Sequence, residues 1–262
     1  MKKEALIINL SDIHLTQKTD LEDRNRQSVY DYLNNLPEGT LSIFPANTPC
    51  ANAVIMCPGG GFNKVNMEHE GYDFAEWFNA QNITYVLLKY HLPNGNKVLP
   101  LQDITDALSV LRELLPETKK IGVMGASIGG YLAAHAALSL PEEMKPDFQI
   151  LLYSVFNMEE EWTHKPSRFR MFGRELTEEE GKAYSLEYEV SFTTPPAFIV
   201  AAADDPAVSP MNSLHYCEHL IQEKVPVSFH LYPCGGHSFG FGDFRYKEEW
   251  LGELKKWLEI MN

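Results

Sequence analysis

Short apolar runs alternate with helical stretches along most of this chain, and this alternation limits its possible folds more than any other feature. Several runs are apolar throughout, which is typical of strands that are covered on both faces of a sheet. Strands that alternate with helices form parallel sheets with right-handed crossover connections. The sequence therefore predicts an α/β domain built on a mostly parallel sheet.

The predicted strands occupy residues 53–57, 84–89, 121–124, 149–153, 197–203 and 227–232. The predicted helices occupy residues 72–79, 104–115, 130–138, 213–222 and 247–258. Within 104–115, leucine and isoleucine recur at three- and four-residue steps, as expected of a helix face that packs on a sheet. The first forty residues are ambiguous, and we assign them to edge strands and a short helix.

The length of 262 residues and the 44% of apolar residues fit one α/β domain that covers residues 1–262. One segment, at about 157–193, is too long for a simple connection between strands. It carries Glu159-Glu160-Glu161, Trp162 and three arginines. We expect this insertion to add one or two helices over the sheet edge, with a small lid as one arrangement.

The charge balance is acidic, with 22 Lys and Arg residues against 36 Asp and Glu residues and a formal net charge of −14. Such a chain repels phosphate backbones and anionic lipid surfaces, so we expect no nucleic-acid partner and no membrane partner. No apolar run approaches the roughly 18 residues of a membrane span, and the run at residues 5–10 is too short for a signal peptide. We expect a cytoplasmic protein as the sequence stands, and a secreted or periplasmic one if a leader was removed before residue 1.

The strongest motif is Gly125-Ala126-Ser127-Ile128-Gly129, which follows the predicted strand at 121–124 and precedes an alanine-rich helix. A G-x-S-x-G motif between a strand and a helix places its serine on a strained, exposed turn. The N–H group of Ile128 would lie at the helix N-terminus, where negative charge is favoured. A tight turn with an idle serine is the alternative, but the context favours Ser127 as a nucleophile.

A glycine loop, Pro58-Gly59-Gly60-Gly61-Phe62, directly follows the predicted strand at 53–57. Three glycines let backbone N–H groups face a cavity without intervening side chains. An oxyanion-hole loop has this composition and this position after a strand. A phosphate-binding loop is disfavoured because no Lys-Ser or Lys-Thr pair follows, and a purely structural turn is the remaining alternative.

An aspartate pair and a histidine follow two later strands. Asp204-Asp205 comes after the predicted strand at 197–203, and His237 comes after the strand at 227–232. Open α/β sheets place their sites at the carboxyl ends of strands, so these residues are expected near Ser127. In such a site the histidine accepts the serine proton, and the carboxylate orients the histidine.

Only one of the two adjacent aspartates can face His237, because successive side chains of an extended segment point in opposite directions. We predict Asp205, since Pro206 biases the preceding residue toward an extended conformation. Val208 then provides an apolar anchor for the returning chain. Asp204 is expected to cap the loop or to face solvent.

The other histidines and the cysteines give weaker signals. His215 and His219 are four residues apart, but the glutamate of a zinc-binding H-E-x-x-H motif is absent. His69 is expected on the surface or just behind the site, and for His164 a surface position is favoured over a pocket position. No metal and no organic cofactor is expected. The cysteines form no CxxC pair and are predicted to be mostly free thiols: Cys50, Cys57, Cys217 and Cys234.

The motifs together resemble those of the acetylxylan-esterase-like carbohydrate esterases, which are serine esterases with the α/β-hydrolase fold. The matching motifs are Pro58-Gly59-Gly60-Gly61-Phe62, Gly125-Ala126-Ser127-Ile128-Gly129-Gly130, Asp205-Pro206-Ala207-Val208 and Gly235-Gly236-His237-Ser238-Phe239. The likeness extends from about residue 50 to the end of the chain. It implies a twisted, mostly parallel sheet of about eight strands with helices on both faces.

Carried over residue by residue, the resemblance implies Ser127, Asp205 and His237 as the catalytic triad. It implies the backbone N–H groups of three residues as the oxyanion hole: Gly60, Gly61 and Ile128. The chain also departs from the family pattern. It has Pro58 where related hormone-sensitive-lipase-like esterases have histidine, Tyr90-His91 where relatives have Tyr-Arg, and the larger Ile128 in place of alanine or methionine.

These observations predict a carboxylic ester hydrolase that removes short acyl groups, acetyl above all, from xylan-derived or other sugars. Its expected partner is a small-molecule or oligosaccharide ester substrate. A prolyl-oligopeptidase-like peptidase, a short-chain lipase and a non-catalytic binding module on the same fold are the alternatives. The charged stretch at 159–174 is unlike the apolar lid of a lipase. A non-catalytic binding module usually lacks one of the triad residues, whereas a serine, an aspartate and a histidine are all present here.

Overall fold

The structure is a computed structural model that describes residues 4–21, 24–48 and 51–261. Within these residues, nine strands form one sheet in the order β2-β1-β3-β5-β4-β6-β7-β8-β9. The strands are β1 (Glu4–Asn9), β2 (Asp12–Asp20), β3 (Thr40–Phe44), β4 (Ala53–Cys57), β5 (Thr84–Lys89), β6 (Ile121–Ala126), β7 (Gln149–Leu152), β8 (Ala197–Ala202) and β9 (Val227–Tyr232).

The sheet is parallel from β5 to β9 and antiparallel from β2 to β5 through β1 and β3. The predicted fold class is therefore confirmed. The sheet has nine strands instead of about eight, because the N-terminal hairpin of β1 and β2 pairs with β3 and extends the antiparallel side. This hairpin falls in the segment that the sequence left ambiguous.

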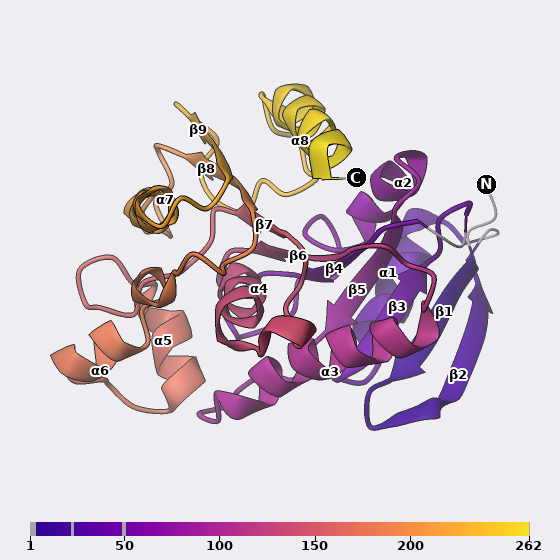
Figure 1. The fold of residues 1–262 in the computed structure, drawn as a ribbon. Helices are drawn as coiled ribbons and strands as arrows, with labels where there is room; N and C mark the ends of the chain where they lie inside the picture. Colours follow the sequence, from indigo (N-terminus) through magenta and orange to yellow (C-terminus); the bar gives the residue numbers. More distant parts are fainter. Residues whose placement is uncertain (1–3, 22–23, 49–50, 262) are drawn as a thin grey trace.

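The helices are α1 (Arg26–Asn35), α2 (Ala75–Ala80), α3 (Val98–Leu114), α4 (Ile128–Ser139), α5 (Lys165–Phe172), α6 (Glu178–Ala183), α7 (Met211–Gln222) and α8 (Lys247–Met261). Three short 3-10 turns join them: η1 (Tyr72–Phe74), η2 (Glu142–Met144) and η3 (Leu186–Glu189). Figure 1 shows α2 and α8 on one side of the sheet and α3 and α4 on the other. Helices thus cover both faces, as predicted.

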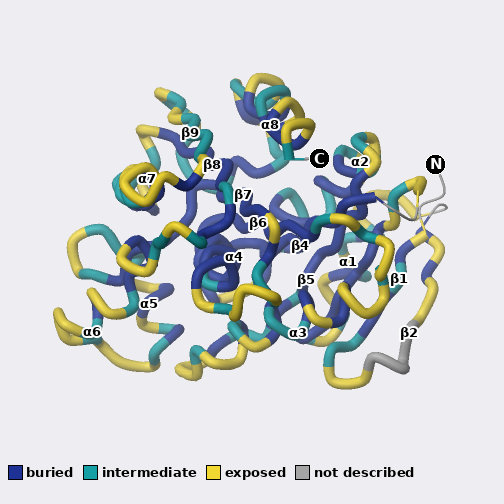
Figure 2. The backbone as a smooth tube through the Cα atoms, in the orientation of Figure 1, coloured by how far each residue is buried: buried dark blue, intermediate teal, exposed yellow. Residues whose placement is uncertain are grey.

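The core lies along the parallel strands. Every residue of β4, β6, β7 and β8 is buried, and Figure 2 shows this centre as a continuous dark blue region. Burial on both faces explains why these runs are apolar throughout. β9 lies at the edge of the sheet, and its residues are only half-buried or exposed.

α4 packs on β4, β6 and β7, and its small residues allow the close approach. A Cβ atom on Gly129 would lie 2.1 Å from the carbonyl oxygen of Cys57, so only glycine fits there. Several alanines that follow in α4 are buried, and their short side chains suit a helix that packs closely on its neighbours. This contact holds the start of α4 beside the end of β4, where the candidate site lies.

The insertion at 157–193 forms α5, α6 and η3. α6 begins with a capping box, in which Thr177 and Glu180 each accept a hydrogen bond from the other's backbone N–H group. In the described residues, no helix has both the length and the apolar character needed to cross a bilayer.

Candidate active site

The candidate site lies where five parallel strands end. The loops after β4, β6, β7, β8 and β9 carry the glycine loop, Ser127, Tyr153, Asp205 and His237 respectively. Because parallel strands present their carboxyl ends at one edge of the sheet, these loops meet although they are far apart in the sequence.

Ser127 occupies a tight turn between β6 and α4. Its backbone angles are φ 54° and ψ −124°, a left-handed φ that residues other than glycine adopt at a cost of about 1–3 kcal/mol. Two hydrogen bonds, to the end of β7 and to the chain just after it, hold this turn: Ser127 N–H donates to Leu152 O at 2.9 Å, and Val155 N–H donates to Ser127 O at 3.0 Å. The strained turn lifts the serine side chain out of the sheet.

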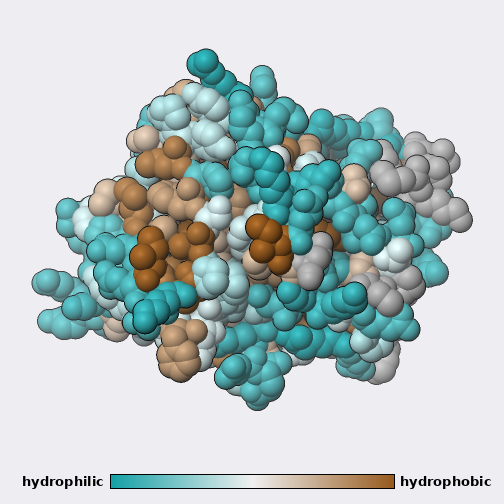
Figure 3. All heavy atoms as spheres, turned by 45° about the horizontal axis from the view of Figure 1, so that its top comes forward, coloured by the Kyte–Doolittle hydropathy of each residue, from teal (hydrophilic) through white to brown (hydrophobic). Residues whose placement is uncertain are grey.

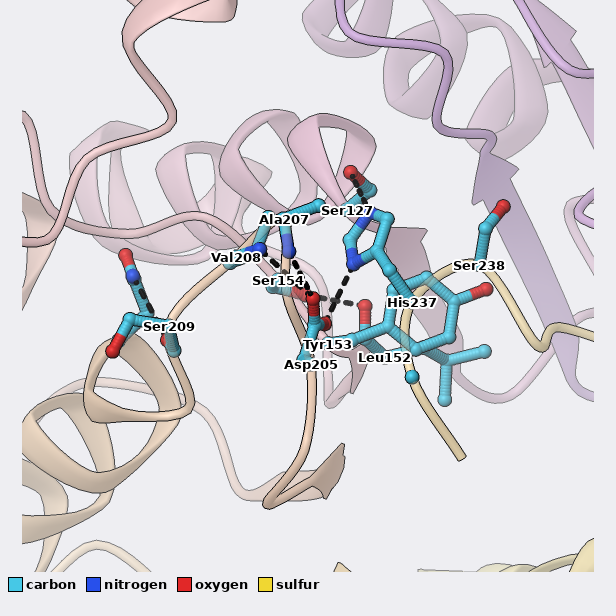
Figure 4. A network of polar contacts seen from close by, with 12 residues as sticks. Ser127, Leu152, Tyr153, Ser154, Asp205, Ala207, Val208, Ser209, His237 and Ser238 are labelled. Atoms are coloured by element: carbon cyan, nitrogen blue, oxygen red, sulfur yellow. Dashed lines mark hydrogen bonds and ion pairs between the residues drawn. The ribbon is translucent and has the colours of Figure 1, made fainter. Parts of the chain in front are cut away.

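His237 lies between Ser127 and Asp205 (Figure 4). Its Nε2 atom is 2.9 Å from Ser127 Oγ, and its Nδ1 atom is 2.6 Å from Asp205 Oδ2. The Asp205 side chain is 1% exposed and the His237 side chain 18% exposed, so the carboxylate is shielded and the imidazole still reaches the cavity. An ionised carboxylate only accepts hydrogen bonds, so Nδ1 is the donor toward Asp205, and in the neutral imidazole Nε2 is the atom that can accept from the serine hydroxyl.

The two adjacent aspartates have different partners. Asp205 Oδ1 accepts hydrogen bonds from the N–H groups of Ala207 at 2.8 Å and Val208 at 2.9 Å, while Oδ2 faces His237. Asp204 Oδ1 accepts a hydrogen bond from Gly236 N–H at 2.8 Å. The structure thus brings Asp205, and not Asp204, to the imidazole, while Asp204 braces the turn before it.

The glycine loop is fixed by its own backbone. Gly60 has φ 126°, and its carbonyl accepts hydrogen bonds from Asn63 N–H at 3.0 Å and Lys64 N–H at 3.3 Å. Tyr90, which keeps the tyrosine of the Tyr-Arg pair of relatives, donates its hydroxyl to Pro58 O at 2.8 Å. Among the described residues, no backbone carbonyl takes the N–H groups of Gly60, Gly61 or Ile128 within ordinary hydrogen-bond geometry. These groups stay available, as an oxyanion hole requires.

Glu70 is a buried carboxylate that our sequence reasoning missed. It is 1% exposed and accepts three side-chain hydrogen bonds, from Tyr153 Oη at 2.8 Å, Ser238 Oγ at 2.7 Å and Asn66 Nδ2 at 3.1 Å. Tyr153 Oη also accepts a hydrogen bond from Gly240 N–H at 2.9 Å. Glu70 therefore joins the segment after the glycine loop to the residue that follows His237.

Tyr153 adds a second link to the histidine. Its ring centroid lies 5.0 Å from that of His237, and the two rings meet edge to face. Tyr153 has φ 36°, a strained left-handed value in a residue other than glycine. Glu68 and Glu70 flank His69 in the sequence, and nothing in this pattern distinguishes the buried carboxylate from its neighbour.

A cavity of about 550 Å³ opens above Ser127 and His237. Its described lining is mostly polar or small: Gly60, Gly61, Lys64, Asn66, His69, Glu70, Ser127, His164, Pro166, Arg170, Ala207, His237 and Ser238. His164 lines the cavity, so the favoured surface position was wrong; the insertion folds back toward the glycine loop and brings this residue with it. Burial lowers the pKa of His164, and the nearby His237 and Arg170 lower that pKa further.

His69 lies beside the same cavity. Its Nε2 atom is 3.0 Å from the backbone oxygen of Ser238, and its own carbonyl accepts a hydrogen bond from Phe241 N–H at 2.7 Å. His69 thus lines the cavity, whereas a position on the surface or just behind the site was expected. In the described chain, no group of three or more His, Cys, Asp or Glu side chains is arranged to hold a metal ion. Cys57, Cys217 and Cys234 carry free thiols, and Cys50 lies outside the described residues.

The arrangement can perform acyl transfer. A hydroxyl, a base within hydrogen-bond reach and a carboxylate that orients the base are the parts needed to activate a serine nucleophile. The adjacent free N–H groups can stabilise negative charge on a carbonyl oxygen.

Comparison with known proteins agrees with this geometry. The profile of a family described as having the alpha/beta hydrolase fold matches residues 54–241. The chain is 33% identical over 225 residues to an acetylxylan esterase of Xylanibacter ruminicola, covering 82% of this chain and 47% of the relative. It is 28% identical over 220 residues to the endo-1,4-beta-xylanase B of Butyrivibrio fibrisolvens, covering 77% of this chain and 34% of that protein. The chain thus spans about half, or less, of the length of these curated relatives.

Solved structures show the same similarity. An acetyl ester-xyloside bifunctional hydrolase from Caldicellulosiruptor lactoaceticus superposes with a TM-score of 0.81 at 26% identity, covering 97% of this chain and 96% of that one. A sugar hydrolase from Lactococcus lactis superposes with a TM-score of 0.73 at 26% identity, covering 84% of this chain and 93% of that one.

Proposed function

The chain belongs to the alpha/beta hydrolase fold family, and from that premise we propose that it is a serine carboxylic ester hydrolase. In this proposal it removes short acyl groups, acetyl above all, from sugars such as xylan fragments. The observation that carries the proposal is the continuous contact from Ser127 Oγ through His237 to Asp205, at 2.9 and 2.6 Å, below a polar cavity.

The proposed reaction begins with attack of Ser127 Oγ on the ester carbonyl carbon. His237 Nε2 takes the serine proton, and Asp205 stabilises the imidazolium that forms. The carbonyl oxygen becomes an oxyanion, which the N–H groups of Gly60, Gly61 and Ile128 bind. When the tetrahedral intermediate collapses, His237 returns the proton to the leaving sugar oxygen, and an acyl-serine remains.

The second half of the reaction repeats these roles with water. His237 removes a proton from a water molecule, the resulting hydroxide attacks the acyl-serine, and the same N–H groups bind the new oxyanion. Collapse releases the carboxylic acid and restores the Ser127 hydroxyl. Across both halves of the reaction, Ser127 and His237 are the protein groups that lose and gain protons, while Asp205 stays ionised and the backbone donors keep theirs.

The cavity lining supports a short acyl group and a polar alcohol. Among the described residues that line it, none is leucine, isoleucine, valine, phenylalanine or methionine. A long acyl chain would strip water from charged and polar side chains without pairing them, which is costly. Sugar hydroxyls, in contrast, can exchange hydrogen bonds with these groups. Two of the similar proteins are named for acetyl esters or acetylxylan, which supports the same substrate class.

The nucleophile is tested with a fluorophosphonate probe and the Ser127→Ala variant. We expect the probe to label the wild-type protein at Ser127 alone, and the variant to lose ester hydrolysis while keeping its circular dichroism spectrum. Labelling at another serine, or full activity in the variant, would reject the assignment.

The substrate class is tested with a panel of p-nitrophenyl esters of increasing acyl length, together with acetylated xylan and aminoacyl amides. We expect kcat/KM to be highest for acetyl and propionyl esters. A steady rise toward octanoyl would indicate a lipase, cleavage of the amides would indicate a peptidase, and no turnover at all would indicate a binding module.

A further inference from the structure

A second hollow adjoins the catalytic cavity. We call it the outer hollow; it measures about 350 Å³ and is lined by Lys165, Pro166, Phe169, Arg170 and Glu175. Pro166 and Arg170 line both the outer hollow and the catalytic cavity. The two spaces are therefore neighbours that share one wall, and a ligand longer than one sugar ring could occupy both.

Phe169 gives the outer hollow an apolar surface. The residue is 50% exposed, whereas Ser167, Arg168 and Met171 of the same helix are buried. An aromatic ring presents a flat apolar face, and one face of a pyranose ring is formed by C–H groups while its hydroxyls lie at the rim. A sugar ring that lies on Phe169 would cover this face and leave its hydroxyls to the charged residues around it.

Two of the three charged residues that line the outer hollow already have ion-pair partners. Lys165 is paired with Glu160, and Glu175 accepts a hydrogen bond from Arg168 at 2.8 Å. Arg170 is different, because no carboxylate in the described part of the chain pairs with it. It donates from Nη1 to Gly61 O at 3.0 Å. A guanidinium has five N–H donors, so Arg170 retains donors for a ligand while it touches the glycine loop.

α5 holds these residues in a preformed arrangement. Arg168, which is buried, donates to Met158 O at 3.2 Å and to Glu160 and Glu175 at 2.8 Å. Gly95 N–H donates to Arg170 O at 2.8 Å, which ties the end of the helix to the segment before α3. A preformed site loses less conformational entropy on binding than a flexible one.

We propose that the outer hollow is a second sugar subsite, in which Phe169 stacks on the pyranose ring next to the ring that bears the acyl group. The inference rests on the proposed function. An acetyl group has only two carbon atoms, so the larger part of the substrate must extend from Ser127 toward the rim of the cavity. Arg170 lines both hollows, and Phe169 lines the outer one. The protein thus acts on xylo-oligosaccharides in preference to single acetylated sugars.

The experiment compares three substrates: p-nitrophenyl acetate, monoacetylated methyl β-xyloside and monoacetylated xylotriose. For wild type we expect a higher kcat/KM on the trisaccharide than on the monosaccharide. Phe169→Ala should lower kcat/KM on the trisaccharide about tenfold, mainly through KM, because the stacked apolar area is lost. Its activity on the two smaller substrates should not change, and Phe169→Trp should keep the trisaccharide preference.

Phe192→Ala is the matched control, since Phe192 is 81% exposed and lines neither hollow. Equal kcat/KM of wild type on the two sugar substrates, or an equal loss by Phe169→Ala on all three substrates, would overturn the subsite. Binding of unacetylated xylotriose to Ser127→Ala, measured by calorimetry with and without Phe169→Ala, tests the subsite apart from catalysis. If the wild-type protein does not hydrolyse p-nitrophenyl acetate, the proposed function is rejected. If Phe169→Ala does not weaken the binding of xylotriose, the subsite is rejected.

Discussion

Asp204 and Asp205 are adjacent in the sequence but hold different parts of the site. Asp205 reaches the His237 imidazole with one oxygen and the N–H groups of the following turn with the other. Asp204 instead accepts the N–H group of Gly236. The residue before the histidine and the histidine itself are therefore held by two neighbouring carboxylates, which makes the pair a direct test of the assignment.

We expect Asp205→Asn to lower kcat on an acetyl ester by about 10⁴-fold, because an asparagine at this position favours the wrong histidine tautomer. Asp204→Asn keeps an acceptor oxygen for Gly236 and should lower kcat only about tenfold. Both variants should retain the wild-type circular dichroism spectrum. The reverse order, with Asp204→Asn inactive and Asp205→Asn active, would make Asp204 the triad acid.

Glu70 is a second single residue on which the site depends, and it lines the catalytic cavity. Its carboxylate accepts hydrogen bonds from the hydroxyl groups of Tyr153 and Ser238. The Tyr153 ring contacts the His237 ring, and Ser238 is the next residue in the sequence. A buried polar network is costly when one member is left unpaired, so we infer that Glu70 positions the histidine loop against the segment that follows the glycine loop.

We expect Glu70→Gln to lower kcat about 10- to 100-fold, as changes to groups that orient site residues commonly do, while KM changes less than about twofold. Glu68→Gln is the control, since Glu68 is a half-buried carboxylate two residues away that contacts Asn34 instead. Kinetic constants on one acetyl ester check the prediction. A pure KM effect in Glu70→Gln would mean that Glu70 binds substrate, and equal effects in both variants would remove its positioning role.

At the scale of elements, the glycine loop is folded so tightly on itself that it has no room for a side chain at Gly60. A Cβ atom on Gly60 would lie 2.1 Å from Lys64 O, and Gly60 has φ 126°. A side chain here would displace the loop from the start of α4, where the Ile128 N–H lies. The loop must therefore stay side-chain-free for geometric reasons, even apart from any role in binding an oxyanion.

We expect Gly60→Ala to lower kcat about 10²-fold with a much smaller change in KM, because the oxyanion exists only in the transition state. Gly252→Ala in α8 is the matched control: its Cβ atom would have no neighbour within 4 Å, and alanine favours helix. Steady-state kinetics and thermal unfolding of both variants check this. A rise in KM alone for Gly60→Ala would assign the loop to substrate binding.

The insertion shows how one element can alter a site built by others. α5 brings His164 and Arg170 to the cavity whose nucleophile and base come from β6 and β9. Its helix end is tied to residue 95 and its Arg170 side chain to Gly61. The insertion therefore forms one wall of the cavity.

For the whole molecule, burial of a titratable group inside α4 links stability to pH. Burial, together with the smaller effect of the nearby Lys97 charge, lowers the pKa of His135 from 6.5 to about 4. Its Nδ1 atom has no hydrogen-bond partner in the described chain. Between pH 6.5 and about pH 4, His135 therefore binds a proton more readily in the unfolded chain than in the folded protein. The stability that the neutral, buried His135 contributes is lost as the pH falls through this range.

We expect His135→Gln to flatten this part of the stability curve. The two pKa values, 6.5 and about 4, correspond to an upper bound of about 3 kcal/mol in the free energy of unfolding. Urea unfolding of both proteins between pH 7.5 and 4 checks the difference. Asp103 and Glu187, whose pKa values are raised by burial, act in the opposite direction in both proteins and cancel in the comparison. Parallel curves for the two proteins would contradict the prediction.

Figure 3 shows a mostly hydrophilic face on which apolar side chains gather in separate patches. The net charge of −14 favours repulsion between copies and from other polyanions. A neutral sugar ester meets no such repulsion, so the charge of the whole molecule is compatible with the proposed substrate.

Much of the fold was predictable from the sequence because its signals are local. The six predicted strands and five predicted helices follow from apolar periodicity, and the structure places an element at each of them. α3 begins at Val98 rather than at Ile104, since Pro100 is tolerated in a first turn and masks the helix start. The strained turn at Ser127 was also predictable, because strand, small residues and helix follow one another within a few positions.

Other features depend on tertiary structure because they join residues that are distant in sequence. Glu70 and Ser238 are separated by 168 positions, and their contact arises only because the loops after β4 and β9 meet at one edge of the sheet. His164 enters the cavity because the insertion folds back toward the glycine loop. The periodicity of apolar residues indicates which side chains of one helix or strand point to the same face of that element. The order of strands and the path of the insertion decide which distant side chains it meets.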